Sequence, residues 1–163
     1  MKVELKNIKY AQFASEETSC FQATVYINGK RSLIARNDGR GGCNMYDPIS
    51  SGAHTQLEEY AKSLPEREFG AGMKGSYQPD ADTVIEDLLI ASLYLKDMKR
   101  ALKKQILFVK PGSDAVWSFS CKPTADNIGT ILEKNPTYKL LNIMPEDEAL
   151  AAWQADLSTG SEA

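Results

Sequence analysis

Apolar and polar residues alternate most regularly near the start of the chain. Four apolar side chains occupy every second position of one stretch: Phe21, Ala23, Val25 and Ile27. This is the period of a strand with one buried face. Asn28-Gly29 then supplies the two residues that a type I′ turn holds at positive φ, and residues 30–36 return as a second apolar run. The pattern predicts an antiparallel hairpin, with a further strand over residues 3–8.

Helical periodicity is strongest between residues 82 and 104, where apolar residues recur every three or four positions. These residues are Ile85, Leu88, Leu89, Leu95, Met98 and Leu102. Acidic residues come first in this stretch and basic residues come last, which complements the helix dipole. Thr83 and Glu86 have the spacing of a capping box, and Asp82 is an alternative cap. The pattern predicts one long helix.

The remaining predicted elements are shorter. Helical patterns cover residues 55–64, 124–134 and 145–157, and apolar runs typical of strands cover residues 106–109, 116–120 and 138–143. Together they predict an α+β fold: an antiparallel sheet with an N-terminal hairpin, extended by the later strands and packed by one long helix and shorter helices. Residues 1–157 are predicted to form a single domain, and residues 158–163 a disordered polar tail.

Composition fits this fold class and leaves several partners open. The chain has 163 residues, of which 42% are hydrophobic and 25% charged, with a net charge of −3. A net charge of this sign argues against general coating of nucleic acid. The balance changes along the chain, however, because residues 61–110 carry nine basic against seven acidic side chains and residues 111–163 carry three against eight. We therefore expect a polarised surface, which keeps nucleic acid among the partners.

Cysteine and histidine usage restricts the chemistry. Cys20, Cys43 and Cys121 are far apart and form no CxxC pair, which favours a reducing cytoplasm over a disulfide framework or a structural zinc site. The single histidine excludes sites that need two or three imidazoles. The sequence shows no signal-peptide core and no apolar run of about 20 residues, so we expect a cytoplasmic protein outside the membrane. We expect neither a metal nor a cofactor.

Residues 37–44 are a run of turn formers with three glycines. Consecutive backbone N–H groups in such a loop can hold an anion, and arginines flank them here. The candidate anion-binding residues are Arg36, Gly39, Arg40, Gly41, Gly42 and Asn44. No Lys-Ser/Thr pair follows at the Walker spacing, so the loop is not a P-loop. The alternative is a structural loop whose glycines satisfy positive φ.

Cys43 and His54 are the one pair of residues that suggests nucleophilic catalysis. The loop between them is long enough to bring a thiol within reach of the imidazole. No orienting third residue accompanies the pair, and a polar residue such as His54 is ordinary near the start of a helix. The sequence therefore leaves enzymatic activity open and favours a non-enzymatic role.

Two further groups of residues are candidates for binding a partner. Four basic side chains share one outer face of the long predicted helix: Lys96, Lys99, Arg100 and Lys103. They can contact nucleic-acid phosphates, or they can be no more than the solvated face of an amphipathic helix. Phe69, Met73 and Tyr77 lie in or beside a glycine-rich loop over residues 70–79. Such residues are common at adaptable protein-binding surfaces, and the alternative is that they hold the loop to the core.

Four segments near the N-terminus carry a resemblance to other proteins. They are Leu5-Lys6-Asn7-Ile8-Lys9, Ser15-Glu16-Glu17-Thr18 with Cys20-Phe21, Gly29-Lys30, and residues 37–46. These segments resemble a pattern in small hypothetical proteins of tailed phages and prophages. Similar proteins show a histidine at the position of Arg40, so a metal or acid–base role for this loop does not carry over. The resemblance implies a setting, a small accessory protein made in a bacterial cytoplasm, and no activity.

We therefore expect a non-enzymatic phage or prophage accessory protein that binds a bacterial host protein or a protein–nucleic-acid complex. Inhibition of a host defence system, in the manner of an anti-CRISPR protein, is one form of this function. The alternatives are an anion- or nucleotide-binding module built on residues 37–44, and a weak nucleic-acid binder that uses the basic end of the long helix. The oligomeric state stays open.

Overall fold

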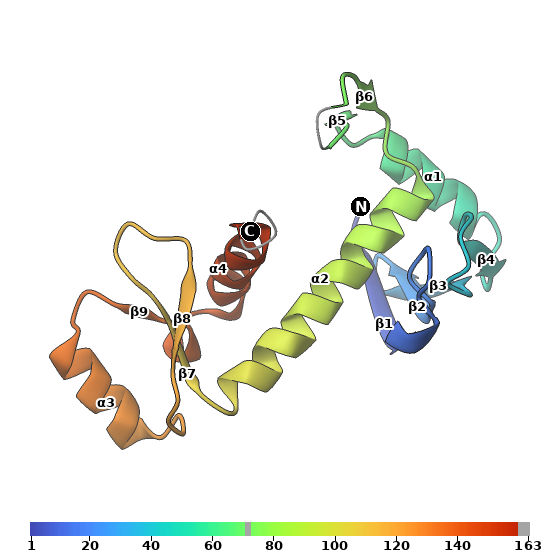
Figure 1. The fold of residues 1–163 in the computed structure, drawn as a ribbon. Helices are drawn as coiled ribbons and strands as arrows, with labels where there is room; N and C mark the ends of the chain where they lie inside the picture. Colours follow the sequence, from blue (N-terminus) through green and yellow to red (C-terminus); the bar gives the residue numbers. More distant parts are fainter. Residues whose placement is uncertain (71–72, 160–163) are drawn as a thin grey trace. The chain divides into compact units, whose positions relative to one another are not determined.

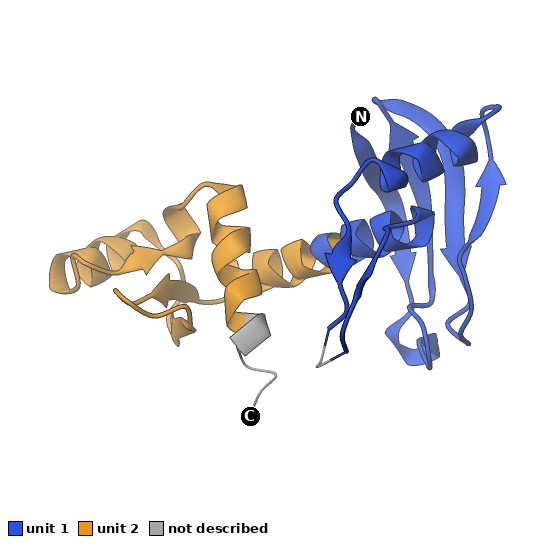
Figure 2. Ribbon diagram, turned by 90° about the horizontal axis from the view of Figure 1, so that it is seen from above, with its two compact units in different colours: residues 1–91 blue, residues 92–163 orange. Residues whose placement is uncertain are grey.

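The chain folds into two compact units, residues 1–91 and residues from Ser92 onward, coloured separately in Figure 2. The computed structural model describes residues 1–70 and 73–159. Helix α2 (Ala81–Leu102) contributes to both units, and each unit has its own sheet (Figure 1). The single domain over residues 1–157 stays a prediction, and the α+β class is confirmed by antiparallel sheets combined with helices.

The first unit is built on a four-stranded antiparallel sheet in the order β1-β2-β3-β4. Its strands are β1 (Val3–Tyr10), β2 (Phe21–Ile27), β3 (Lys30–Asn37) and β4 (Met45–Pro48). The predicted hairpin is confirmed, because Asn28 and Gly29 take φ values of 50° and 79° and turn β2 into β3. Strand β4 was not predicted, since four residues ending in proline are too few to show an alternating pattern.

One face of this sheet is apolar and covered by helices. Its buried side chains are Phe21, Ala23, Val25, Leu33 and Ala35. Helix α1 (Ala53–Lys62) and the first turns of α2 lie on this side of the strands (Figure 2). Tyr46 of β4 faces the same side, where its ring contacts His54 of α1 and its hydroxyl contacts Asp82 of α2. The opposite face, which we call the outer face, carries exposed polar residues such as Gln22 and Arg36.

The segment between α1 and α2 is a small hairpin. Strands β5 (Arg67–Glu68) and β6 (Ser76–Tyr77) pair antiparallel, so the predicted loop over residues 70–79 includes one arm of this hairpin. Residues 71–72 of that loop lie outside the described residues.

Helix α2 begins earlier than the sequence predicts, and a different residue caps it. The backbone N–H of Thr83 donates to Oδ1 of Asp80 at 2.8 Å, and the Thr83 hydroxyl donates to the same oxygen at 2.7 Å. The predicted cap at Thr83 or Asp82 is therefore wrong. The physical reason is that Asp82 accepts hydrogen bonds from Tyr46 and Asn44 instead, which leaves Asp80 to cap the helix.

The second unit contains a three-stranded antiparallel sheet in the order β8-β7-β9. Its elements are β7 (Ile106–Val109), β8 (Val116–Phe119), α3 (Ala125–Lys134), β9 (Lys139–Leu140) and α4 (Glu146–Thr159). The expectation that later strands extend the first sheet is wrong, since they pair only with one another among the described residues. Ile106 and Phe108 pack on one side of β7, whereas Leu107 packs with Met98 on the other.

The C-terminal elements differ from the prediction in length. The strand predicted over residues 138–143 stops at Leu140, and a 3₁₀ turn (Leu141–Ile143) follows. Asn142 causes this change, because its side chain accepts from Leu107 N at 2.9 Å and donates to the carbonyls of Leu102 and Gln105. The predicted disordered tail over residues 158–163 begins within α4, and its last four residues lie outside the described residues.

Candidate functional site

The glycine-rich loop over residues 37–44 packs against the loop over residues 11–20, and we call this contact the loop brace. Its centre is the buried side chain of Asn37. Oδ1 of Asn37 accepts from the Thr18 hydroxyl at 2.8 Å and from Gly39 N at 2.9 Å. Nδ2 donates to the carbonyl of Gly42 at 3.2 Å and to Oδ1 of Asn44 at 3.1 Å. This one amide is therefore satisfied entirely within the protein.

Gly39 joins the two loops through its backbone. Its carbonyl accepts from the backbone N–H groups of Glu16 and Glu17, each at 3.0 Å. Its φ is +84°, and a Cβ at this position would lie 2.0 Å from the carbonyl oxygen of Ala14. Only glycine fits both the left-handed backbone and this close approach. The glycine that the sequence marks as a candidate ligand thus has a structural explanation.

Of the six predicted anion-binding residues, Gly39, Gly41, Gly42 and Asn44 take part in the loop brace, whereas neither arginine contributes a hydrogen bond to it among the described contacts. Gly39 and Gly41 donate their N–H groups to side chains of the protein, Gly41 to the Thr18 hydroxyl at 3.2 Å. Asn44 belongs to the brace as well, while Gly42 contributes its carbonyl. Arg36 lies on the outer face, with Nε 3.1 Å from Asp47, and Arg40 is exposed. Anion binding by these residues stays a prediction.

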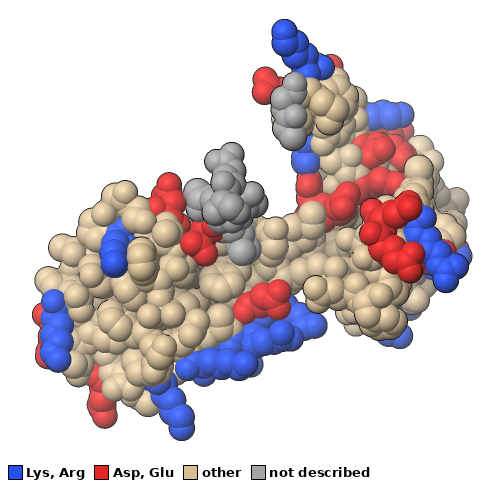
Figure 3. Space-filling view, viewed as in Figure 1, with Lys and Arg blue, Asp and Glu red and all other residues tan. Residues whose placement is uncertain are grey.

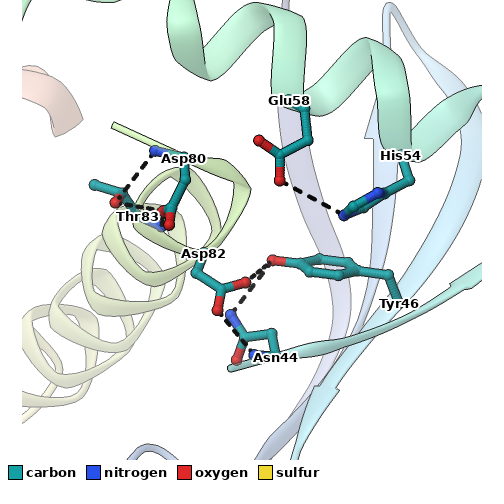
Figure 4. Close-up of polar contacts among 7 residues, drawn as sticks. All are labelled: Asn44, Tyr46, His54, Glu58, Asp80, Asp82 and Thr83. Atoms are coloured by element: carbon teal, nitrogen blue, oxygen red, sulfur yellow. Dashed lines mark hydrogen bonds and ion pairs between the residues drawn. The ribbon is translucent and has the colours of Figure 1, made fainter. Parts of the chain in front are cut away.

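A second polar network connects β4 to the start of α2 (Figure 4). The Tyr46 hydroxyl donates to Oδ1 of Asp82 at 2.5 Å, and Asn44 N donates to Oδ2 of Asp82 at 2.9 Å. Burial, and then the neighbouring Asp82 carboxylate, raise the pKa of Tyr46 well above its ordinary value. The hydroxyl therefore stays protonated and acts as a donor, which ties the loop brace to α2.

The Cys43–His54 pair is not joined in the structure. The His54 ring lies 4.7 Å from the Tyr46 ring, and its Nε2 lies 3.7 Å from Oε1 of Glu58 in the same helix (Figure 4). Cys43 is exposed on the glycine-rich loop. Over residues 1–70 and 73–159, no hydrogen bond links the two, and no group of three or more His, Cys, Asp or Glu residues is arranged to hold a metal. Catalysis by this pair stays a prediction.

The three predicted aromatic and methionine residues lie on the β5–β6 hairpin. The rings of Phe69 and Tyr77 stack with their centroids 5.4 Å apart. Phe69 is 42% exposed and Met73 is 66% exposed. Tyr77 therefore supports Phe69 within the hairpin, while Met73 is open to solvent, and binding of a partner by these residues stays a prediction.

The basic residues of α2 line an open groove of about 480 Å³ in the second unit. We call Lys96, Lys99, Arg100 and Lys103 the basic stripe, and Figure 3 shows Lys and Arg gathered along this edge of the helix. Lys99 lies 2.5 Å from Glu146, and Arg100 lies 3.7 Å from Asp97. Within the described part of the chain, no ion pair involves Lys96 or Lys103. The structure thus brings these four predicted residues together on one surface.

Sequence reasoning missed one prominent side chain. Phe13, in the short 3₁₀ turn between β1 and β2 (Gln12–Ala14), is 93% exposed. Ala11, two residues earlier, lines an open pocket of about 400 Å³ together with residues that include Lys9 and Arg36. An isolated aromatic residue in a polar stretch without strand or helix period was the available signal.

Comparisons with known proteins do not identify this arrangement. No family model, no curated protein and no solved structure matches the chain. Among the described residues, the helices lack the combination of length and apolar character needed to cross a membrane.

Proposed function

We propose that this protein is a non-enzymatic binding protein that contacts a bacterial protein–nucleic-acid complex through the basic stripe. The observation that carries the proposal is the stripe itself, with four cationic side chains on one open groove. Nucleic-acid phosphates are the partner that such a row fits best, because each contact releases condensed counterions and adds affinity without requiring sequence recognition.

The spacing of the stripe supports a contact with successive phosphates. Lys96 and Lys99 lie on one side of α2, and Lys103, directly after the last helical residue Leu102, lines the same groove. At a rise of about 1.5 Å per residue, the Cα atoms of Lys96 and Lys99 are about 4.5 Å apart along the helix axis. All three are exposed and can follow a flexible backbone. Leu95 and Ser92, which line the same groove, add a partly apolar floor.

The polar residues in and around the glycine-rich loop also favour the basic stripe as the binding site. Asn37, Asn44 and Asp82 are hydrogen-bonded to neighbouring groups of the protein. Groups engaged in this way serve the fold. The stripe differs because Lys96 and Lys103 are exposed and form no ion pair among the described residues, while the pairs Lys99–Glu146 and Arg100–Asp97 lie at the surface.

The setting and the protein contact are the finer parts of the proposal. The resemblance of the N-terminal segments favours a phage or prophage protein acting in the bacterial cytoplasm, where inhibition of a host defence complex is the function we propose. The β5–β6 hairpin, with Phe69 and Met73 exposed, offers a surface for the protein component of such a complex. In a plaque assay against a defended host, expression of the wild-type protein should restore phage growth and a stripe variant should not.

The nucleic-acid part is tested directly by binding. We propose titrating a labelled DNA duplex with the wild-type protein and with Lys96→Gln/Lys99→Gln/Lys103→Gln at several salt concentrations. The triple variant should weaken binding and reduce the slope of log K against log salt by about 2 to 3, since each lost phosphate contact contributes about 0.9.

A matched control removes the same charge elsewhere in the same unit. Lys122, Lys134 and Lys139 are exposed and lie away from the groove. Their triple substitution to Gln should therefore retain most of the affinity for the DNA duplex and most of the slope of log K against log salt. Equal losses in the two triple variants would show that only net charge matters and would contradict the proposed site. No binding by the wild-type protein at low salt would contradict the function itself.

A further inference from the structure

Phe13 is displayed by a rigid support. The loop over residues 11–20 is fixed at both ends, because Ala11 N donates to the Cys20 carbonyl at 3.0 Å and the Ser15 hydroxyl donates to the Ala11 carbonyl at 3.0 Å. The loop brace holds its second half through Gly39. An exposed apolar side chain on a fixed support loses little conformational freedom on binding, which is the property of an interaction anchor.

The first unit also has a pocket whose lining includes Ala11, two residues before Phe13. Its apolar lining comes from Tyr10, Ala11, Cys20, Phe21 and Met45, and its volume is about 400 Å³. A cavity of roughly 150 Å³ accepts benzene, so the pocket has room for a phenyl ring. Ala11, which lines the pocket, is two residues from Phe13, and the chain spans at most about 7 Å over that interval.

The charges around the two features are complementary. Phe13 is followed by the exposed Glu16 and Glu17. The polar lining of the pocket includes the cationic side chains of Lys9 and Arg36 and the carboxylate of Asp38. Arg36 contacts Asp47 through Nε, and the remainder of its guanidinium is available for a further partner. An acidic segment that carries a phenyl ring therefore suits a pocket whose lining has a cationic excess.

We infer that the protein forms a two-fold symmetric dimer in which Phe13 of each copy occupies the pocket of the other. A chain that carries both a projecting ring and a pocket suits an isologous interface, because a two-fold rotation makes both contacts at once. The occupant is a second copy of this chain because the chain carries both the ring and the acidic residues that the pocket fits. This inference goes beyond the proposed function and uses none of the residues of the basic stripe.

Sedimentation velocity of the full chain over a wide concentration range tests the dimer. We expect a concentration-dependent dimer for the wild-type protein. Phe13→Ala should raise its dissociation constant at least about tenfold. Ile143→Ala, at an exposed apolar residue of the second unit, should leave the constant unchanged. Because Phe13 is almost fully exposed in the single chain, its substitution should leave the fold intact, which an unchanged far-ultraviolet circular dichroism spectrum checks.

A mixing experiment tests the reciprocal exchange. Gln22→Trp places a large side chain in the pocket from an exposed position on β2 and keeps Phe13. Phe13→Ala keeps an open pocket but lacks the ring, and Gln22→Trp keeps the ring but fills the pocket, so neither variant should dimerise alone. In a mixture, Phe13 of the Gln22→Trp chain can enter the open pocket of the Phe13→Ala chain, and heterodimers should form. A strictly monomeric wild-type protein, a dimer indifferent to Phe13→Ala, or a mixture that associates no better than its components would each overturn the inference.

Discussion

The loop brace and the basic stripe look alike in sequence as candidate ligand sites, yet they use their polar groups in opposite ways. In the brace, Asn37 and the N–H groups of Gly39 and Gly41 are bonded within the protein. In the stripe, Lys96 and Lys103 are exposed. Residue types suited to binding therefore indicate a site only where the fold leaves them accessible. We expect substitutions in the brace to change stability and substitutions in the stripe to change binding.

The strongest test of the brace is Gly39→Ala. Its Cβ would lie 2.0 Å from the Ala14 carbonyl oxygen and 2.8 Å from Cβ of Cys20, at a φ of +84°. We expect a loss of about 3–5 kcal/mol in the free energy of unfolding, from overpacking and backbone strain together. Urea denaturation followed by circular dichroism measures this loss.

Gly42→Ala is the matched control for that substitution. Gly42 has a φ of +85°, but a Cβ there meets nothing within 4 Å. Only the cost of the left-handed backbone applies, about 1–2 kcal/mol. Equal losses in the free energy of unfolding at the two glycines would show that the close approach of Gly39 to the loop over residues 11–20 does not contribute to stability.

A smaller effect is expected at Tyr46. Tyr46→Phe removes the donor to Asp82, and hydrogen bonds to charged groups are worth about 1.5–3 kcal/mol. Tyr10→Phe, at a surface tyrosine, should cost less than about 0.5 kcal/mol.

The effect of Tyr46→Phe on the free energy of unfolding should also depend on pH. The folded pKa of Tyr46 is raised from the ordinary value of 10.0, so its contribution is complete below that pH and is lost as the pH rises above it. The difference in stability between the wild-type protein and Tyr46→Phe should therefore shrink in alkaline solution. A difference that is constant up to high pH would contradict the buried donor.

Asp80 should contribute less to the free energy of unfolding than Gly39 or Tyr46. Asp80→Ala removes the cap of α2 and should cost about 1 kcal/mol. Hydrogen bonds from the backbone N–H and the hydroxyl of Thr83 lower the pKa of this carboxylate, so its contribution exists above a pH of about 3.8 and is lost as the pH falls through the lower folded value. Asp80→Asn should keep most of the cap and lack this acid dependence, as denaturation at neutral pH and at acid pH would show.

The smallest effect on stability is expected in the stripe. Lys96→Gln/Lys99→Gln/Lys103→Gln should change the free energy of unfolding by no more than about 0.5 kcal/mol, because these side chains are exposed and the Lys99–Glu146 pair is solvent-accessible. A loss as large as that of Tyr46→Phe, measured by the same urea denaturation, would mean that the stripe also serves the fold.

The sequence predicted those parts of the molecule that depend on neighbours in the chain. The period-2 pattern before Asn28-Gly29 was enough for the hairpin, because its turn residues and register are local. The helical period between residues 82 and 104 was likewise enough for α2. The four basic residues of the stripe were predicted together because helical spacing alone places them on one face.

The remaining features depend on contacts between distant residues. Gly39 is required by Ala14, and Asp82 is withdrawn from capping by Tyr46, 36 positions earlier. No periodicity encodes either contact. The glycine-rich loop follows the same rule, because Thr18, remote in sequence, donates to Asn37 and accepts from Gly41 N.

The most direct test of this difference between brace and stripe is one titration of the labelled DNA duplex by fluorescence anisotropy at low salt. It should include the wild-type protein, the triple lysine variant of the stripe, and Arg40→Gln, which removes the exposed cation of the glycine-rich loop. We expect the stripe variant to lose affinity at least about tenfold and Arg40→Gln to bind within about twofold of the wild-type protein. A large loss in Arg40→Gln with full affinity in the stripe variant would contradict the account and return the binding site to the glycine-rich loop.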